Sequence, residues 1–276
     1  MMCETCFLLI LNIIKMKLRI TCLQTDIVAQ NPEANRRHID ELLYGIEETD
    51  LIVLPETFTT GFPADAEIFA EDENGDTFCW LREKSADCHC VMAGTFITKE
   101  GKMHYNTFVI MFPDGNCMKY HKHHTFKMGG EKDLDEGDAL IIFELKGWKI
   151  RPFVCYDLRF PVWNRNKYDG SSYEYDIAMF TANWPAQKSL VWNTLLTARA
   201  IENVAYVIGV NRVGVDHNDI PYIGESMILN AKGRPVVKAG DKEEIISAVL
   251  DKEDMESFRN YFTVSEDWDR FTFKNL

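Results

Sequence analysis

The sequence GWKIRPFVCYDLRFPVW, residues 147–163, is the stretch that decides the fold. Its first half is short, apolar and rich in β-forming residues, which predicts a buried strand over residues 148–153. The strand stops at Cys155, and a polar run that begins with Tyr156 follows directly. Functional side chains of α/β proteins gather at the carboxyl ends of strands. Cys155 is therefore a candidate nucleophile, with the next backbone N–H free to bind an oxyanion. The alternative is a structural cysteine, because most free cysteines are inert packing residues.

Composition limits the class of protein. The chain of 276 residues is long enough to bury one large α/β core, and 46% hydrophobic with 26% charged residues excludes an intrinsically disordered chain. The formal net charge of −13 argues against nucleic acid or an anionic membrane surface as a partner. The 8 cysteines show no regular framework in a chain of this length, which favours reduced thiols and a cytoplasmic location.

The first residues are unusual. Residues 7–14, FLLILNII, are apolar but too few to span a bilayer, and they lack the basic start and the cleavage site of a signal peptide. Met16 then precedes a credible first strand at 17–23. We expect residues 1–15 to be a non-native or disordered extension upstream of the natural start, and residues 16–276 to form a single domain. A short packing or membrane-associated tail is the alternative for 1–15.

Strands and helices alternate along the remaining chain, and hairpins interrupt them. This balance favours two sheets flanked by helices, and the absence of a low-complexity linker favours one domain. The sequence predicts strands at 17–23, 50–54, 91–98, 105–112, 148–153, 176–181, 207–210 and around 227–229 and 236–237, with a further strand that ends in 119–124 and an apolar segment at 140–145. It predicts helices after Asn31, at 76–88, at 192–206 and after Asp251.

Three chemically active residue types fall at predicted strand ends: Glu56, Lys122 and Cys155. A thiol needs a base within hydrogen-bond reach to become a nucleophile, and a desolvated carboxylate could take its proton. A lysine could hold the thiolate and later an oxyanion. On this hypothesis Cys155 is a low-pKa thiol that alkylates faster than the other cysteines. Taken singly, each residue also has an ordinary explanation: a loop-capping carboxylate, a solvated lysine and a packing cysteine.

The sequence motifs that contain these residues resemble those of a known family. LPETFTTGF contains Glu56, YHKHHTF contains Lys122 and FVCYDLRFPVW contains Cys155, in that order. Together they resemble the carbon–nitrogen hydrolase (nitrilase) superfamily with its Glu-Lys-Cys triad, over essentially the whole chain from Met16. TARAIENVAYVIGVNRVG and GESMILN belong to the same resemblance. CYDLRFPVW and ANWP (182–185) resemble more narrowly the bacterial omega-amidases that hydrolyse 2-oxoglutaramate.

The resemblance implies an α/β fold, a four-layer αββα sandwich, in chains that associate as homodimers or larger homo-oligomers. It implies that Glu56 is the general base and then the acid for ammonia, and that Cys155 is the nucleophile. Lys122 and the Tyr156 backbone N–H would form the oxyanion hole. The second glutamate of the family, which orients the lysine, would be Glu131, with a spacing to the following glycine one residue shorter than the family pattern.

The implied activity is that of an amidase without cofactor or metal, which releases ammonia from the ω-amide of a small 2-oxo acid through a thioester. Its alternatives are an N-carbamoyl amino-acid amidohydrolase, a nitrilase and a non-catalytic binding protein on the same fold. Arg159 is the candidate for binding a substrate carboxylate, because a guanidinium can bind it through two hydrogen bonds; an ion pair with Asp157 or another acid is the alternative. Trp184 is a candidate for the apolar wall of the substrate pocket, and core packing is its alternative.

Two other motifs could suggest zinc. They are Cys88-His89-Cys90 and the histidines at 121, 123 and 124. Adjacent residues on a strand point to opposite faces, and the chain has no Cys-x-x-Cys pair of the usual structural spacing. We therefore expect no metal site.

Overall fold

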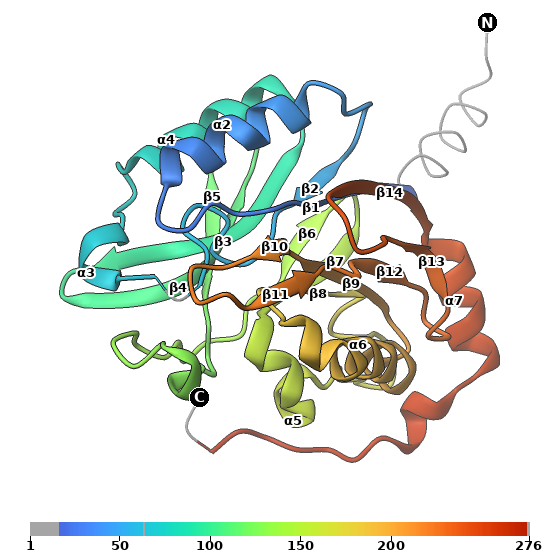
Figure 1. Ribbon diagram of the computed structural model, residues 1–276. Helices are drawn as coiled ribbons and strands as arrows, with labels where there is room; N and C mark the ends of the chain where they lie inside the picture. Colours follow the sequence, from blue (N-terminus) through green and yellow to red (C-terminus); the bar gives the residue numbers. More distant parts are fainter. Residues whose placement is uncertain (1–16, 63, 275–276) are drawn as a thin grey trace, which may run out of the picture.

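The structure is a computed structural model that describes residues 17–62 and 64–274. The expected extension at 1–15 lies outside these residues. Two six-stranded mixed sheets pack face to face, and helices cover their outer faces (Figure 1). Helices α2 and α4 lie side by side over one sheet, while α5 and α6 lie on the opposite side of the molecule. The predicted four-layer αββα sandwich is confirmed.

The first sheet has the strand order β14-β1-β2-β3-β4-β5. Within it, β1, β2 and β3 are parallel to one another. The remaining strands pair antiparallel: β14 with β1, β4 with β3, and β5 with β4. The sequence did not predict β14, whose residues pair with β1 from Lys17↔Asp251 to Gln24↔Glu244. The bounds are β1 Lys17–Gln24, β2 Leu51–Val53, β3 Val91–Glu100, β4 Met103–Met111, β5 Cys117–His121 and β14 Glu244–Asp251.

The second sheet has the order β13-β12-β9-β8-β7-β6, with β7, β8 and β9 parallel. A separate hairpin, β10–β11, follows β9. The apolar segment expected at 140–145 is a strand only in its last three residues. The bounds are β6 Phe143–Leu145, β7 Trp148–Val154, β8 Ile177–Ala182, β9 Tyr206–Asn211, β10 Val213–Val215, β11 Pro221–Ile223, β12 Met227–Leu229 and β13 Pro235–Lys238.

Helix ends follow local capping. The Asn31 side chain accepts a hydrogen bond from the Ala34 N–H at the start of α2. The helix predicted at 192–206 is α6, which begins earlier and stops at Asn203, because Val204 takes a left-handed conformation that turns the chain into β9. The α-helices are α2 Pro32–Leu43, α3 Ala66–Phe69, α4 Asp76–Asp87, α5 Pro161–Asn164, α6 Ser189–Asn203 and α7 Lys252–Tyr261. The 3₁₀ helices are η1 Lys127–Gly129, η2 Cys155–Arg159, η3 Ala186–Lys188 and η4 Val264–Asp267.

None of the helices in the described part of the chain has the length and apolar character that a membrane crossing requires.

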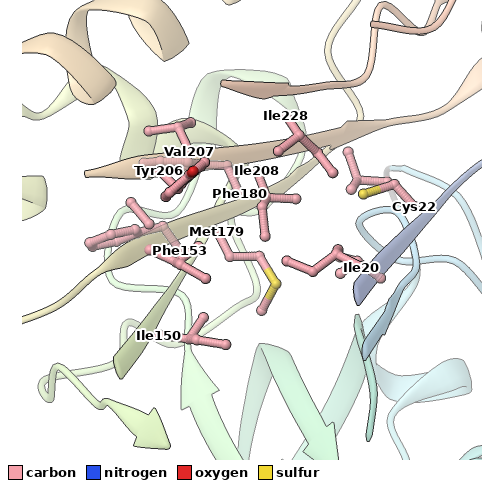
Figure 2. Packing of buried hydrophobic residues seen from close by; sticks show 14 of the residues in the cluster. Ile20, Cys22, Ile150, Phe153, Met179, Phe180, Tyr206, Val207, Ile208 and Ile228 are labelled. Carbon is pink, nitrogen blue, oxygen red and sulfur yellow. The ribbon is translucent and has the colours of Figure 1, made fainter. Parts of the chain in front are cut away.

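The main core lies between the two sheets. In Figure 2, Ile20 and Cys22 of β1 point toward Met179 and Ile228 of the second sheet. A second apolar cluster lies between the first sheet and its helices. Strand alternation divides the side chains between these layers, because successive residues point to opposite faces.

The parallel strands of both sheets bring their carboxyl ends to one place. Glu56 follows β2 closely and Asn183 follows β8 directly, and the Asn183 side chain donates a hydrogen bond to the Glu56 carbonyl at 3.0 Å. Cys155 follows β7, the strand that pairs with β8. The fold therefore places a polar corner where the two sheets meet.

Close packing between the second sheet and α6 gives a test of this core. A Cβ atom on Gly209 of β9 would overlap Leu196 and lie 3.0 Å from Cζ2 of Trp192. Since α6 would have to move, we expect Gly209→Ala to lower the free energy of unfolding by about 1–3 kcal/mol in urea denaturation. Gly45→Ala is the control, because a Cβ there meets nothing within 4 Å. Equal stability of Gly209→Ala and the wild type would contradict this packing.

Candidate active site

The four residues predicted to be catalytic converge at the polar corner. The Lys122 ammonium lies 2.9 Å from Oε1 of Glu56 and 2.8 Å from Oε2 of Glu131. These three side chains are almost completely buried, with 1%, 1% and 2% exposed. Cys155 is half-buried and lines the same cavity as Glu56 and Lys122. Lys122 is the first residue after β5, so the strand that was expected to reach position 124 ends just before it.

Asn106, which sequence reasoning missed, ties the two carboxylates together. Its side-chain NH₂ group donates to Glu56 Oε1 and to Glu131 Oε1, each at 2.9 Å. Asn106 lies inside β4 and is 1% exposed. A buried amide within a predicted strand needs hydrogen-bond partners, and this is the signal that could have marked it.

Asn183 holds the other side of Glu56. Its backbone N–H donates to Glu56 Oε2 at 2.8 Å, and its side chain donates to the hydroxyl of Thr57 at 2.8 Å. The carboxylate of Glu56 therefore receives donors at both oxygens, and its position is fixed by residues from both sheets.

The charges of the cluster act on its titrating groups. Burial lowers the pKa of Lys122, but the carboxylates of Glu131 and Glu56 outweigh this effect and raise that pKa above its ordinary value. Burial raises the pKa of the Cys155 thiol well above its ordinary value, and Glu56 raises it further, while Lys122 opposes both effects. The low-pKa thiol expected from the sequence is therefore wrong, because burial and the Glu56 carboxylate together disfavour ionisation of the thiol.

A charge count shows how the nucleophile can form. With Glu56 and Glu131 ionised and Lys122 protonated, the cluster carries one net negative charge. A thiolate on Cys155 would add a second, which is costly in a buried site. Transfer of the thiol proton to Glu56 leaves the total charge unchanged. The geometry thus suits proton transfer to Glu56 during attack, with the same proton available later for a leaving group.

The turn at Cys155 offers an oxyanion site. Cys155 has φ +41° and is the first residue of η2, so the chain turns sharply between β7 and this helix. The N–H groups in the first turn of a helix have no intrahelical partner. Among the hydrogen bonds found for residues 17–62 and 64–274, none uses the Tyr156 N–H. This N–H and the Lys122 ammonium are the two donors available to an oxyanion at Cys155.

Asp157 joins the nucleophile turn to the lysine segment. It is fully buried and accepts hydrogen bonds from the Tyr120 hydroxyl at 2.7 Å, from the Val154 N–H at 3.0 Å and from Nδ1 of His124 at 2.8 Å. Sequence reasoning did not assign it this role. Asp157 is therefore not the ion-pair partner of Arg159, and that alternative is wrong.

Arg159 and Trp184 form one wall of the cavity. The Arg159 guanidinium lies 5.0 Å from the centre of the Trp184 ring. Within the described part of the chain, no carboxylate lies within 4.0 Å of Arg159, which is an exposed cation. Trp184 is 4% exposed, and Tyr156 and Phe62 also line the cavity, whose volume is about 170 Å³. This is less than the roughly 300–1,000 Å³ of pockets for drug-sized ligands, so the substrate must be small.

Two of the histidines considered as zinc ligands pack against different aromatic rings. His121 stacks on Tyr105, and His123 stacks on Trp163. Residues 17–62 and 64–274 contain no group of three or more His, Cys, Asp or Glu side chains that could hold a metal ion.

Comparison with known proteins extends over nearly the whole chain. Residues 19–260 match the model of the carbon-nitrogen hydrolase family. The chain is 42% identical to the omega-amidase YafV of Escherichia coli strain K12, across 92% of this chain and 98% of that protein. It is 33% identical to the 2-oxoglutaramate amidase of Bacillus subtilis, across 91% and 98%. The crystal structure of XC1258 from Xanthomonas campestris, a CN-hydrolase superfamily protein with an arsenic adduct in the active site, matches with a TM-score of 0.90 and 36% identity, across 93% of this chain and 99% of that chain.

The coupling between Glu56 and Cys155 predicts opposite effects of one substitution. Glu56→Gln removes the negative charge that raises the Cys155 pKa. We therefore expect the pH profile of iodoacetamide alkylation at Cys155 to move to lower pH, while turnover falls about 10²–10⁴-fold through loss of the base. Mass spectrometry of the Cys155 peptide measures the first effect and ammonia release the second.

Glu100→Gln is the matched control, because Glu100 also pairs with a lysine, Lys119, but is 44% exposed. It should change neither property. An alkylation profile of Glu56→Gln that stays in place or moves to higher pH would contradict the electrostatic coupling.

Proposed function

Because the chain belongs to the carbon–nitrogen hydrolase family, we propose that it releases ammonia from the ω-amide of a small 2-oxo acid, such as 2-oxoglutaramate or 2-oxosuccinamate. The observation that carries this proposal is the convergence of Glu56, Lys122 and Cys155 in one small cavity. The names of the relatives, omega-amidase and 2-oxoglutaramate amidase, support the substrate class. The chain is an amide-hydrolysing enzyme.

The first half of the reaction forms a thioester. The Cys155 sulfur attacks the amide carbon as the thiol proton moves to Glu56. The Lys122 ammonium and the Tyr156 N–H stabilise the resulting oxyanion. When the tetrahedral intermediate collapses, the C–N bond breaks, and the leaving nitrogen takes the proton from Glu56 and departs as ammonia. Glu131 and Asn106 keep the lysine and the base in place during these steps.

The second half hydrolyses the thioester. Glu56, ionised again, takes a proton from water as the water oxygen attacks the thioester carbon. The same two donors stabilise the second oxyanion. Collapse breaks the C–S bond, the sulfur receives the proton from Glu56, and the dicarboxylic product leaves. The charge of the cluster is the same at the start and at the end.

The substrate carboxylate needs a cation within the cavity. Arg159 is exposed and has no acidic partner in the described residues, and its planar guanidinium suits a carboxylate. The Trp184 ring packs against the guanidinium, and Phe62 contributes part of the apolar wall. A local positive site is necessary, because an anionic substrate approaches a protein with a net charge of −13. The cytoplasmic location and the homodimer or larger homo-oligomer expected from the sequence stay predictions.

A panel of substrates tests the reaction. We expect ammonia release from 2-oxoglutaramate to exceed release from N-carbamoyl-β-alanine and from a simple nitrile by more than tenfold in kcat/KM, which is about 1.4 kcal/mol of transition-state binding. The reason is that the relatives named omega-amidase and 2-oxoglutaramate amidase favour an ω-amide, while the simple nitrile also lacks a carboxylate for Arg159. A tenfold preference for the carbamoyl compound or the nitrile would place the enzyme in another branch of the family.

The carboxylate anchor has its own test. We expect Arg159→Ala to lower kcat/KM for 2-oxoglutaramate roughly 10–100-fold, because a charge-assisted contact is lost, and to leave the hydrolysis of a simple uncharged amide unchanged. Arg37→Ala, which removes a 67% exposed arginine from α2, is the control. If Arg159→Ala leaves kcat/KM for 2-oxoglutaramate unchanged, another residue binds the carboxylate.

A further inference from the structure

A second cation, the partly buried Lys188, lines the cavity in addition to Arg159. Lys188 belongs to the lining residues, and its ammonium lies 5.2 Å from the centre of the Phe126 ring. Within the described residues no carboxylate lies within 4.0 Å of Lys188. The reaction as derived above uses Lys122 and Arg159 and leaves this ammonium without a role.

The backbone of Lys188 is held in place. Its N–H donates to the Pro185 carbonyl at 2.9 Å, and its own carbonyl accepts the Nε1–H of Trp184 at 2.9 Å. Trp184 thus contacts both residues: its ring centre lies 5.0 Å from the Arg159 guanidinium, and its indole N–H donates to the backbone carbonyl of Lys188. The Trp184 side chain, which is 4% exposed, therefore positions the Arg159 guanidinium and the backbone from which the Lys188 side chain extends.

The acids of the cavity do not neutralise these cations. Glu56 is paired with Lys122. Asp216 accepts the Tyr222 hydroxyl at 2.9 Å and the backbone N–H groups of Asn218 and Ile220 at 2.8 and 3.1 Å. Asp216 and one substrate carboxylate together balance the charges of Arg159 and Lys188. Within the described residues the Lys188 ammonium has no hydrogen-bond acceptor or acidic partner, so it remains a donor for a further electron-rich group of the substrate.

We propose that Lys188 binds the 2-oxo oxygen of the substrate and thereby selects 2-oxo acid amides over the corresponding amino-acid amides. The inference rests on the proposed function, which supplies the reacting amide. A 2-oxo acid presents a carboxylate and a ketone oxygen on adjacent carbons. The guanidinium of Arg159 takes the carboxylate by two hydrogen bonds, and the compact ammonium of Lys188 takes the single ketone oxygen.

An amino-acid amide would bind poorly at the position of the ketone oxygen. Glutamine carries an ammonium group where 2-oxoglutaramate carries the ketone oxygen, and this cation would face Lys188 in a small cavity. An amide with a plain methylene at that carbon leaves Lys188 without a partner but brings no repulsion. A site that hydrogen-bonds a substrate group discriminates strongly against analogues that lack it. The expected order is therefore 2-oxoglutaramate, then glutaramate, then glutamine.

The ordinary explanation is that Lys188 is a solvated lysine stabilised by the Phe126 ring. That role gives no discrimination at the carbon next to the carboxylate. Lys232 provides the matched control, since it is an exposed lysine whose ammonium lies 5.0 Å from the centre of the Phe258 ring.

The experiment measures kcat/KM for the three amides with the wild type, Lys188→Met, Lys188→Arg and Lys232→Met. We expect Lys188→Met to lose roughly 10–100-fold for 2-oxoglutaramate, the span of one charge-assisted hydrogen bond, and to keep near-normal rates for glutaramate. Glutamine should gain relative to 2-oxoglutaramate. Lys188→Arg should retain most of the preference, and Lys232→Met should match the wild type. The glutaramate rate also shows that each variant is folded.

Two results overturn the proposal while the amidase stands: a wild type that hydrolyses glutaramate without favouring 2-oxoglutaramate, or a Lys188→Met variant in which all three amides change by the same factor. A wild type that hydrolyses none of the three amides would overturn the proposed function, and the role of Lys188 with it.

Discussion

A lysine buried between two carboxylates is the constraint on which the site depends. Lys122, Glu56 and Glu131 lie within salt-bridge distance and are almost entirely removed from water. Removing one partner of a buried ion pair lowers the free energy of unfolding by about 3–5 kcal/mol. The cluster is therefore stable only when all three charged groups are present. The fold meets this condition because the three residues that follow β2, β5 and η1 lie at the same corner: Glu56, Lys122 and Glu131. In addition, Asn106 donates a hydrogen bond to each carboxylate. Stability and chemistry therefore depend on the same few side chains.

The same cluster determines how the thiol reacts. Burial raises the pKa of the Cys155 thiol above its ordinary value, and the Glu56 carboxylate raises it further. The nucleophile then forms only when Glu56 takes the proton, and the proton remains where the leaving ammonia needs it. A preformed thiolate would instead add charge to a buried site. Asp157 fixes the geometry of this exchange by holding the Cys155 turn against the segment that carries Lys122.

The sequence predicts those parts of the structure that depend on local pattern. Glu56, Lys122 and Cys155 could be found because each lies at the end of a predicted strand and within a motif that resembles the family. For Asn106 the sequence offers only the signal of an amide inside an apolar strand, and it does not name the partners, which are 50 and 25 residues away in the chain. β14 was missed for a similar reason: its partner β1 lies more than 200 residues earlier. The low thiol pKa was wrong because the shift depends first on the burial of Cys155 and then on the charges around it, and the spacing of residues in a sequence gives neither.

The central claim is that Cys155 carries the acyl group while Glu56 holds the proton for ammonia. The most direct measurement is rapid acid quenching of the enzyme during turnover of 2-oxoglutaramate, followed by mass spectrometry of the intact protein and of the peptide that contains Cys155. The account predicts one acyl group per chain, located on Cys155, with one ammonia released for each group formed before the steady state. Ammonia release without any acyl adduct, or an adduct on another residue, would contradict it.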